Sequence, residues 1–357
     1  MKILVGMSGG VDSSVTAKLL LEQGHTVAGV TLQLFPQPGA CGDVADAQAV
    51  AARLGIPHTC VPMPERFVDT VLRDFTTRYF AGCTPNPCVV CNRCIKFGAM
   101  LDYALAEGFD AVATGHYVRS GQDPATGRYC LYRGADAAKD QSYFLHALTQ
   151  QQLAHAVFPL GGMTKQTVRG IAEDAGLVNA KKHDSQDICF VPDGDYAGFL
   201  LRYTGQAPAH GDFVDAAGQV LGRHGGLFRY TIGQRKGLGV ALGKPVYVTG
   251  KNAVDNTVTL GEDEDLFADA LLAAQMNWIS IAPPDAPLRC AAKIRNTQTV
   301  LQPVTVEPLP DGHARVIFDT PQRAISPGQS VVLYDGERVL GGGLITDGTD
   351  VGKTCCF

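Results

Sequence analysis

Three cysteines in a Cys-x2-Cys-x2-Cys pattern are the residues of this sequence best suited to chemistry: Cys88, Cys91 and Cys94. Residues 84–87 (Thr-Pro-Asn-Pro) precede them, and the two prolines disfavour a helix before Cys88. If a helix begins there, the thiols lie three residues apart along one face. Such a set can ligate an iron–sulfur cluster or zinc, or form a reactive thiolate pair, which nearby basic residues would favour. The pattern predicts thiol chemistry and leaves the choice among these open.

A loop rich in glycine and serine, residues 6–14 (Gly-Met-Ser-Gly-Gly-Val-Asp-Ser-Ser), follows the first apolar run. Its glycines let the backbone approach an anion, and the next helix would point free N–H groups at that anion. Ser8, Ser13 and Ser14 can donate hydrogen bonds, and Asp12 can hold Mg²⁺. The loop is neither a Walker A loop nor a GxGxxG fingerprint. It resembles the PP-loop of ATP pyrophosphatases, which bind pyrophosphate and transfer AMP to a substrate oxygen.

The elements that must position these groups alternate between strand and helix in the first half of the chain. Apolar periodicity predicts strands at 2–7, 26–34, 58–62 and 111–115, and helices at 15–23, 43–54, 67–80 and 95–107. This alternation predicts an α/β fold with a doubly wound parallel sheet. Ligands of such a sheet gather beyond the carboxyl ends of its strands, where the loop at 6–14 would lie.

The second half of the chain has a different texture. From about residue 196, glycine-rich turns and short strands dominate, and from about residue 270, β-rich runs are broken by Pro-Pro, Pro-Asp-Gly and Pro-Gly pairs. Such a pattern is typical of a small antiparallel barrel or sandwich. We therefore expect an ATP-binding catalytic domain at 1–195, a small connector at 196–268, and a C-terminal antiparallel β-barrel at 269–357.

Composition narrows the class of protein. The chain has 357 residues, 45% hydrophobic and 18% charged, which suits two or three globular domains. We find no run of 18 apolar residues and no signal-peptide core at the start, so we expect a cytoplasmic protein that makes no membrane contact. Eleven cysteines in a chain of this kind indicate metal, cluster or redox chemistry rather than a disulfide framework. The net charge of −5 means that an RNA substrate would need a locally basic surface.

Six motifs occur in order and carry a more specific resemblance. They are Gly-Met-Ser-Gly-Gly-Val-Asp-Ser (6–13), Thr-Pro-Asn-Pro-x-x-x-Cys-Asn (84–92), Ala-Thr-Gly-His-Tyr (113–117), Lys-Asp-Gln-Ser-Tyr-Phe-Leu (139–145), Ser-Gln-Asp-Ile-Cys-Phe (185–190) and Gly-Gln-Arg-Lys-Gly-Leu-Gly (233–239). Together they resemble the bacterial tRNA-specific 2-thiouridylases, the MnmA family, over nearly the whole chain. That family uses ATP to adenylate O2 of the wobble uridine, and a sulfur nucleophile then displaces AMP. The resemblance implies tRNA as substrate and a cysteine desulfurase or sulfur-relay protein as sulfur donor.

The resemblance also implies roles for single residues. Cys189 matches the cysteine that carries the persulfide, and Cys91 matches its partner, which releases the sulfur or forms a disulfide with Cys189. Residues implied in ATP binding are Gly6, Met7, Ser8, Gly9, Gly10, Val11, Asp12, Ser13, Leu32 and Gly115. Asn86, Pro87 and Cys88 would lie at the target base. Residues implied in tRNA contact are His116, Lys139, Asp140, Gln141, Arg295, Asn296 and Gln329.

Cys88 is a departure from the family, many members of which have Asp at this position. A thiol cannot simply replace that carboxylate as acid or base, because its ordinary pKa lies several units higher. As an alternative to a persulfide, Cys88, Cys91 and Cys189 could ligate three irons of a [4Fe–4S] cluster whose fourth iron delivers sulfide. Cys94 could be a spare ligand. The sequence leaves both routes open.

Two other classes of protein share part of this pattern. Other ATP pyrophosphatases, which adenylate carboxylates or other bases, need the loop at 8–13 but not Cys91 and Cys189. An RNA-binding module with structural, metal-holding cysteines would not need the phosphate loop. Loss of the two thiols without effect would favour the first class, and ATP/pyrophosphate exchange argues against the second.

Overall fold

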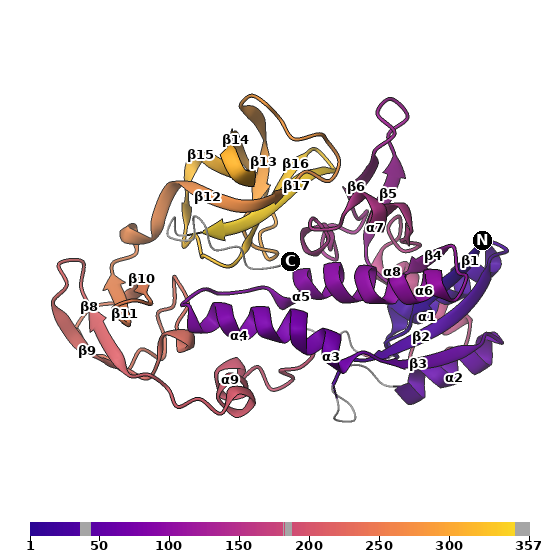
Figure 1. The fold of residues 1–357 in the computed structure, drawn as a ribbon, viewed down its shortest axis with the longest axis horizontal. Helices are drawn as coiled ribbons and strands as arrows, with labels where there is room; N and C mark the ends of the chain where they lie inside the picture. The colour runs from indigo at the N-terminus through magenta and orange to yellow at the C-terminus, as the bar shows by residue number, and fades with distance from the viewer. Residues whose placement is uncertain (36–43, 181, 183–187, 347–357) are drawn as a thin grey trace.

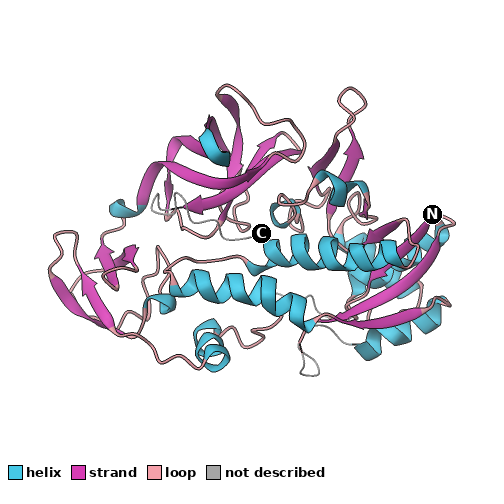
Figure 2. Cartoon of the chain, in the orientation of Figure 1, coloured by secondary structure: helices cyan, strands magenta, loops and turns pink. Residues whose placement is uncertain are grey.

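The computed structural model describes residues 1–35, 44–180, 182 and 188–346, and it has three parts in chain order (Figure 1). Figure 2 shows a mixed helix and strand region first, then two regions built mostly of strands. Within the described residues, every helix is too short or too polar to cross a membrane.

A five-stranded parallel sheet in the order β3-β2-β1-β4-β7 forms the centre of the first part. Its strands are β1 (Lys2–Gly6), β2 (Thr26–Gln33), β3 (His58–Pro62), β4 (Ala111–Ala113) and β7 (Ala156–Val157). Because β1 pairs with both β2 and β4, the phosphate loop leaves the middle of the sheet at its carboxyl edge. The predicted α/β class with a parallel sheet is confirmed.

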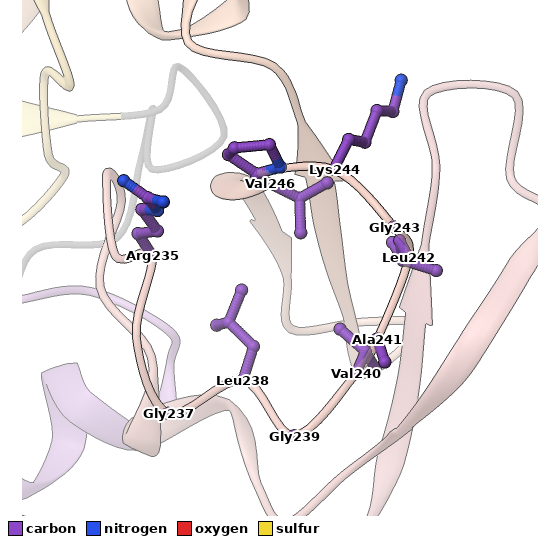
Figure 3. A pocket seen from close by; sticks show the side chains of 11 residues that line it. Arg235, Gly237, Leu238, Gly239, Val240, Ala241, Leu242, Gly243, Lys244 and Val246 are labelled. Carbon is purple, nitrogen blue, oxygen red and sulfur yellow. The ribbon is translucent and has the colours of Figure 1, made fainter.

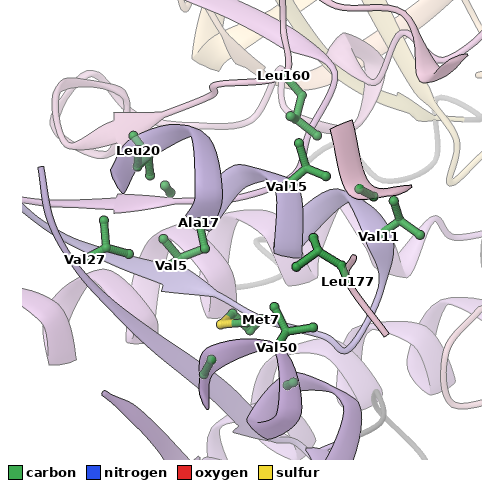
Figure 4. Close-up of a cluster of buried hydrophobic side chains, with 14 of the residues drawn as sticks. Val5, Met7, Val11, Val15, Ala17, Leu20, Val27, Val50, Leu160 and Leu177 are labelled. Carbon is green, nitrogen blue, oxygen red and sulfur yellow. The ribbon is translucent and has the colours of Figure 1, made fainter. Parts of the chain in front are cut away.

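Helices cover both faces of this sheet. On one face, α1 (Val11–Glu22), α2 (Val44–Leu54) and α8 (Lys165–Asp174) pack on Val5 and Met7 (Figure 4). On the other face, α6 (Met100–Ala106) packs on Leu4. Successive strand residues point to opposite faces, so a strand covered on both sides must be apolar where it is covered, as Ile3, Leu4 and Val5 of β1 are.

Two long helical rods cross the first part (Figure 1). The first runs continuously through α3 (Pro64–Phe67), the π-helical η1 (Val68–Leu72) and α4 (Arg73–Phe80); the second runs through α5 (Pro87–Cys91), the π-helical η2 (Asn92–Ala99) and α6. Both begin earlier than the predicted residues 67 and 95, because proline is favoured in the first helical turn. The second rod therefore contains all three clustered cysteines.

The middle part is small and has its own core. It contains α9 (Tyr196–Thr204) and a four-stranded sheet, β10-β11-β8-β9, made of β8 (Gly211–Val214), β9 (Val220–His224), β10 (Tyr247–Asn252) and β11 (Thr257–Gly261). Phe213 and Val248 are fully buried at its centre. Aromatic contacts join it to the first part, because Tyr196 stacks on Tyr79 with ring centroids 4.8 Å apart.

The third part is a closed antiparallel barrel of six strands, as predicted. They are β12 (Phe267–Asn277), β13 (Leu288–Lys293), β14 (Gln302–Leu309), β15 (His313–Arg323), β16 (Ser330–Asp335) and β17 (Arg338–Thr346), and pairing of β12 with β17 closes the ring. A hairpin of the first part, β5 (Val118–Gln122) and β6 (Tyr129–Arg133), pairs with β17 and so extends the barrel sheet. Sequence periodicity did not predict this hairpin. Short helices complete the fold: η3 (Ser142–Phe144), α7 (Gln150–Ala154), η4 (Leu227–Arg229), η5 (Glu264–Leu266) and η6 (Pro310–Gly312).

Candidate functional site

The phosphate loop connects β1 to α1 through a tight turn. Gly9 has a φ of 75°, a left-handed conformation that glycine adopts without strain. Gly10 is the N-cap of α1, and no side chain in the described part of the chain caps that helix end. The N–H groups of the first turn are therefore available to an anion. The Ser13 hydroxyl braces the curve, since it accepts from Ser8 N–H (3.3 Å) and donates to the Gly10 carbonyl (3.1 Å).

Gly115 lies against the first turn of α1. A Cβ at this position would be 2.8 Å from Asp12 Cβ and 3.0 Å from Ser13 N, so only glycine allows the approach. Met7 and Val11 are buried beneath the loop and support it from the core, while Leu32 on β2 is half-buried. Gly115, Met7 and Val11 thus lie around a single turn of backbone, whereas Leu32 packs with other apolar clusters.

Asp12 is already paired in this structure. Its carboxylate accepts from Lys165 Nζ at 2.7 and 2.9 Å and from the Tyr117 hydroxyl at 2.8 Å. The Lys165 side chain is 10% exposed and the Asp12 side chain 30%, so this ion pair is partly shielded from solvent. Both carboxylate oxygens of Asp12 already accept hydrogen bonds, so Mg²⁺ would share them with, or displace, Lys165 and Tyr117.

Sequence reasoning missed Lys165, Tyr117 and Asn179 as parts of this site. Asn179 is buried, and its Nδ2 donates to the Gly9 carbonyl (3.0 Å) and to Ser14 Oγ (2.9 Å), which holds the loop from behind. No local signal could have found Lys165 or Asn179, because each reaches the loop across more than 150 residues of sequence. Tyr117 is the last residue of the Ala-Thr-Gly-His-Tyr motif at 113–117, and the resemblance implies no role for it.

The cysteine helix begins with the predicted Asn86 and Pro87. Asn86 is the N-cap of α5, where its Oδ1 accepts from Cys88 N–H at 3.2 Å, and Pro87 is at the first helical position. Cys88 is exposed, whereas Cys91 is 9% exposed and packs with apolar side chains such as Ile95. The two thiols that follow one another on this helix therefore have different access to solvent.

The surrounding protein desolvates the thiols of both Cys91 and Cys88, although Cys88 keeps an exposed surface. Desolvation raises the pKa of Cys91 to about 12, with Lys96 acting in the opposite direction and the neighbouring Cys189 and Cys88 adding to the rise. Desolvation likewise raises the pKa of Cys88, against the effect of Lys96. Cys91 is consequently a neutral thiol at pH 7 in this arrangement, and it needs a change of environment to become a nucleophile.

Cys189 comes close to the cysteine helix although it is far away in the sequence. The next residue, Phe190, packs in the same apolar cluster as Cys91 and contacts Phe75 (ring centroids 5.1 Å) and Phe67 (5.7 Å). Cys189 itself is exposed and near enough for its charge to act on both Cys88 and Cys91. Residues 185–187 of the same motif lie outside the described residues.

The predicted cluster ligands do not form a metal site in this arrangement. Among the described residues, no group of three or more His, Cys, Asp or Glu side chains is placed to hold a metal ion. As the side chains are placed, the thiols of Cys88, Cys91 and Cys189 therefore do not fit a [4Fe–4S] group.

Four of the predicted tRNA contacts lie near the carboxyl end of β4, and two of them face inward. His116 is buried and hydrogen-bonds Thr114 Oγ1 (2.7 Å), and desolvation lowers its pKa well below the ordinary value. The Asp140 carboxylate is 1% exposed, so its surface is closed to a direct RNA contact here. Gln141 accepts from Tyr117 N–H (3.0 Å), and Lys139 is half-buried.

The other three predicted tRNA contacts are in the barrel. Arg295 and Asn296 follow β13 and are half-buried; the Arg295 guanidinium donates to the Ala324 carbonyl, and the buried Asn296 Oδ1 has no hydrogen-bond partner among the described residues. Gln329 Nε2 donates to the Thr84 carbonyl (2.8 Å), next to the cysteine helix. Gln329 therefore connects the barrel to the segment that leads into the cysteine helix.

A hollow of about 450 Å³ lies in the middle part, on the predicted Gly-Gln-Arg-Lys-Gly-Leu-Gly segment (Figure 3). Arg235, Lys244 and apolar side chains such as Leu238 line it. No cysteine and no residue of the phosphate loop is part of that lining. The chemistry described above is thus not in this hollow.

Comparison with known proteins places the chain in a family. Three family models match it in succession: "tRNA methyl transferase HUP domain" at residues 1–193, "tRNA methyl transferase PRC-barrel domain" at 197–262 and "Aminomethyltransferase beta-barrel domain" at 268–345. The tRNA-specific 2-thiouridylase MnmA of Acetivibrio thermocellus is 47% identical over 96% of this chain and 99% of its own length. The protein of the same name from Heliobacterium modesticaldum is 50% identical over 98% of this chain and 93% of its own length.

Among solved structures, the U34-tRNA thiolase NcsA from Methanococcus maripaludis, determined with its [4Fe–4S] cluster, is a distant match. It is 19% identical, has a TM-score of 0.34, and covers 57% of this chain and 66% of its own. So distant a likeness says nothing about the cysteines of the present chain. The relatives at 47–50% identity over nearly the full length are decisive, and the chain belongs to the MnmA family of tRNA-specific 2-thiouridylases.

Proposed function

We propose that this protein uses ATP to replace O2 of the wobble uridine of tRNA with sulfur. The observation that carries the proposal is that Cys91 and Cys189, distant in sequence, lie within electrostatic reach of each other, since Phe190 packs in the apolar cluster that contains Cys91. The same domain has an anion-binding loop at the end of its central strand. Activation of an oxygen by a nucleotide and delivery of sulfur by a thiol pair need these two features together.

In the first step, the phosphate loop binds the pyrophosphate end of ATP through the N–H groups of α1. The O2 atom of uridine attacks the α-phosphorus, pyrophosphate leaves, and O2 becomes bonded to AMP. AMP is a good leaving group, whereas a carbonyl oxygen is a poor one. The close packing of Gly115 on α1 supports this role, because it fixes the position of the turn whose N–H groups would bind the anion.

In the second step, the terminal sulfur of a persulfide on Cys189 attacks C2, and AMP leaves with the former O2. Cys91 then attacks the Cys189 sulfur, which releases the thiolated base and leaves a Cys91–Cys189 disulfide that an external dithiol reduces. The exposure of Cys189 supports its role as the acceptor from a donor protein, and the burial of Cys91 suits an internal nucleophile. The lack of fit of a [4Fe–4S] group favours this persulfide route over the cluster route.

The division of labour follows from the architecture. We propose that residues 1–195 perform both steps, that 196–268 and 269–357 hold the RNA, and that a cysteine desulfurase or relay protein supplies sulfur to Cys189. Lys139, Gln141, Arg295, Asn296 and Gln329 remain proposed RNA contacts. The eleven cysteines suit the reducing cytoplasm, where we propose the protein works.

The test is mass spectrometry of wobble uridine in tRNA incubated with protein, ATP and a sulfur source. We expect 2-thiouridine with the native protein and none with Cys91→Ser or Cys189→Ser, although both variants should bind ATP as the native protein does. Full thiolation by either variant would remove that cysteine from the mechanism. Metal analysis of anaerobically purified protein separates the routes, because thiolation that depends on stoichiometric iron would contradict the persulfide route.

A further inference from the structure

The turn at residues 327–329 (Pro-Gly-Gln) of the barrel makes two hydrogen bonds with the backbone of Thr84. Thr84 N–H donates to the Pro327 carbonyl at 2.8 Å, and the Thr84 carbonyl accepts from Gln329 Nε2 at 2.8 Å. Both backbone polar groups of one residue are therefore bound by the same short turn. Thr84 is the first residue of the Thr-Pro-Asn-Pro segment that leads into the cysteine helix.

Gly328 lets the two segments touch. Its φ is 91°, and a Cβ at this position would lie 2.9 Å from both Cys83 Cβ and Thr84 N, and 3.0 Å from Thr84 C. Real Cβ atoms almost never come within 3.0 Å of such neighbours. The contact thus requires glycine at 328 for two independent reasons, its backbone conformation and the space that it leaves.

The turn is itself firmly anchored. Gly328 N–H donates to the Ile345 carbonyl (2.9 Å) and Ile345 N–H donates to the Gln329 carbonyl (2.8 Å), which ties the turn to β17. The next residue, Ser330, is held by the fully buried Tyr143 of the first part, whose hydroxyl accepts from Ser330 N–H (3.2 Å) and donates to its carbonyl (2.9 Å). A turn held on both sides acts as a fixed support for Thr84.

The chain between Thr84 and the thiols is stiff. Pro85 and Pro87 have fixed φ angles, and Asn86 between them caps α5 through Cys88 N–H. A displacement of Thr84 is therefore passed on to the first turn of the helix, where Cys88 lies, and to Cys91 one turn later.

We infer that the 327–329 turn is a positioning element for the cysteine helix, with Gln329 a positioning residue that acts through Thr84. The inference rests on the proposed function, in which Cys91 must change from a buried thiol to a nucleophile. An RNA group that hydrogen-bonds the Gln329 amide competes with the Thr84 carbonyl for the same donor. RNA binding on the barrel thereby loosens the support of the cysteine helix when substrate is present.

The test uses the full-length protein and two variants that break the contact differently. Gln329→Ala removes the amide donor, and Gly328→Ala leaves every potential RNA-contacting side chain in place but pushes a Cβ into Thr84. The matched control is Gly312→Ala in the same barrel, where φ is also positive (72°) but no atom lies within 4 Å of the new Cβ. The readout is the rate of iodoacetamide labelling of Cys91, resolved by peptide mass spectrometry in the absence of RNA.

We expect Cys91 labelling to rise about fivefold in Gln329→Ala, the factor that corresponds to one net hydrogen bond, and at least as much in Gly328→Ala. Gly312→Ala should label like the native protein, and ATP affinity should be unchanged in all three. Native labelling without tRNA in a folded Gln329→Ala variant overturns the inference. If labelling rises as expected but the native protein does not thiolate tRNA, the proposed function fails while the positioning contact stands.

Discussion

Replacing Gly115 with alanine tests the idea that the first turn of α1 binds the phosphates of ATP. The new Cβ would lie 2.8 Å from Asp12 Cβ, 2.9 Å from Asp12 C and 3.0 Å from Ser13 N, so backbone and not a flexible side chain must move. Overpacking of this kind costs about 1–3 kcal/mol of stability. The backbone that moves carries the N–H donors to the anion. Misplacing one hydrogen bond to a charged group costs about 1.5–3 kcal/mol, which corresponds to an approximately 10- to 100-fold weaker Kd for ATP.

The assay is isothermal titration calorimetry of ATP binding, with thermal unfolding as a check that the variant is folded. Gly162→Ala is the control, because no atom lies within 4 Å of the Cβ that it adds. That variant should bind ATP like the native protein. A folded Gly115→Ala protein whose ATP affinity is within twofold of native would refute the assignment of this turn to phosphate binding.

Three other predictions concern groups with unusual surroundings. Lys165→Met leaves the Asp12 carboxylate with Tyr117 as its remaining partner here. Since the ion pair is only partly shielded, this change should lower the free energy of unfolding by about 1–2 kcal/mol in urea titrations. Lys165→Arg should retain most of that stability. Because the pKa of Cys91 is raised to about 12, the rate at which Cys91 is labelled in the folded protein should keep increasing from pH 9 to 12. In urea, the labelling rate should level off near the ordinary thiol pKa. A plateau at pH 9 in the folded protein would contradict this prediction. Because the native state retains this proton longer than the unfolded chain, the associated stability is complete below about pH 9 and is lost as the pH rises towards 12. Asp140→Ala removes a carboxylate that accepts hydrogen bonds from Arg133 and Ser142, and it should destabilise the fold by about 2–4 kcal/mol. A urea midpoint equal to that of the native protein would show that this network is not structural.

Features that depend on near neighbours could be predicted from the sequence. The strand at 58–62 has the same bounds in the structure, and the glycine loop lies between a buried strand and a helix as expected. Helix starts were less accurate, because apolar spacing alone does not register a proline at the first position, as at Pro64 and Pro87. Alternating proline-containing turns and β-rich runs were enough to predict the barrel.

Features that depend on long-range contacts could not be predicted. The partners of the phosphate loop, Lys165 and Asn179, have no pattern of their own and are identified only when the chain folds back. Asp140, which the resemblance implies in tRNA contact, forms a buried network because the β6 strand passes beside it. The exposure of Cys189 and the burial of Cys91 likewise follow from which aromatic side chains surround them, and spacing carries no such information.

The π-helical stretch η2 has a consequence for how one rod serves two purposes. Before this stretch, α5 must turn Cys88 and Cys91 towards Cys189. After it, α6 must turn Met100 and Leu101 towards the sheet. In an α-helix each residue advances by about 100°, so the two directions would be locked together by the number of residues between them. Hydrogen bonds from residue i to i+5, as between Ile95 and Met100, widen the turn and reduce that advance. The stretch therefore sets the rotational phase between the thiol end and the core end, and deletion of one residue within it would rotate the cysteines off their face while leaving the sheet contacts intact.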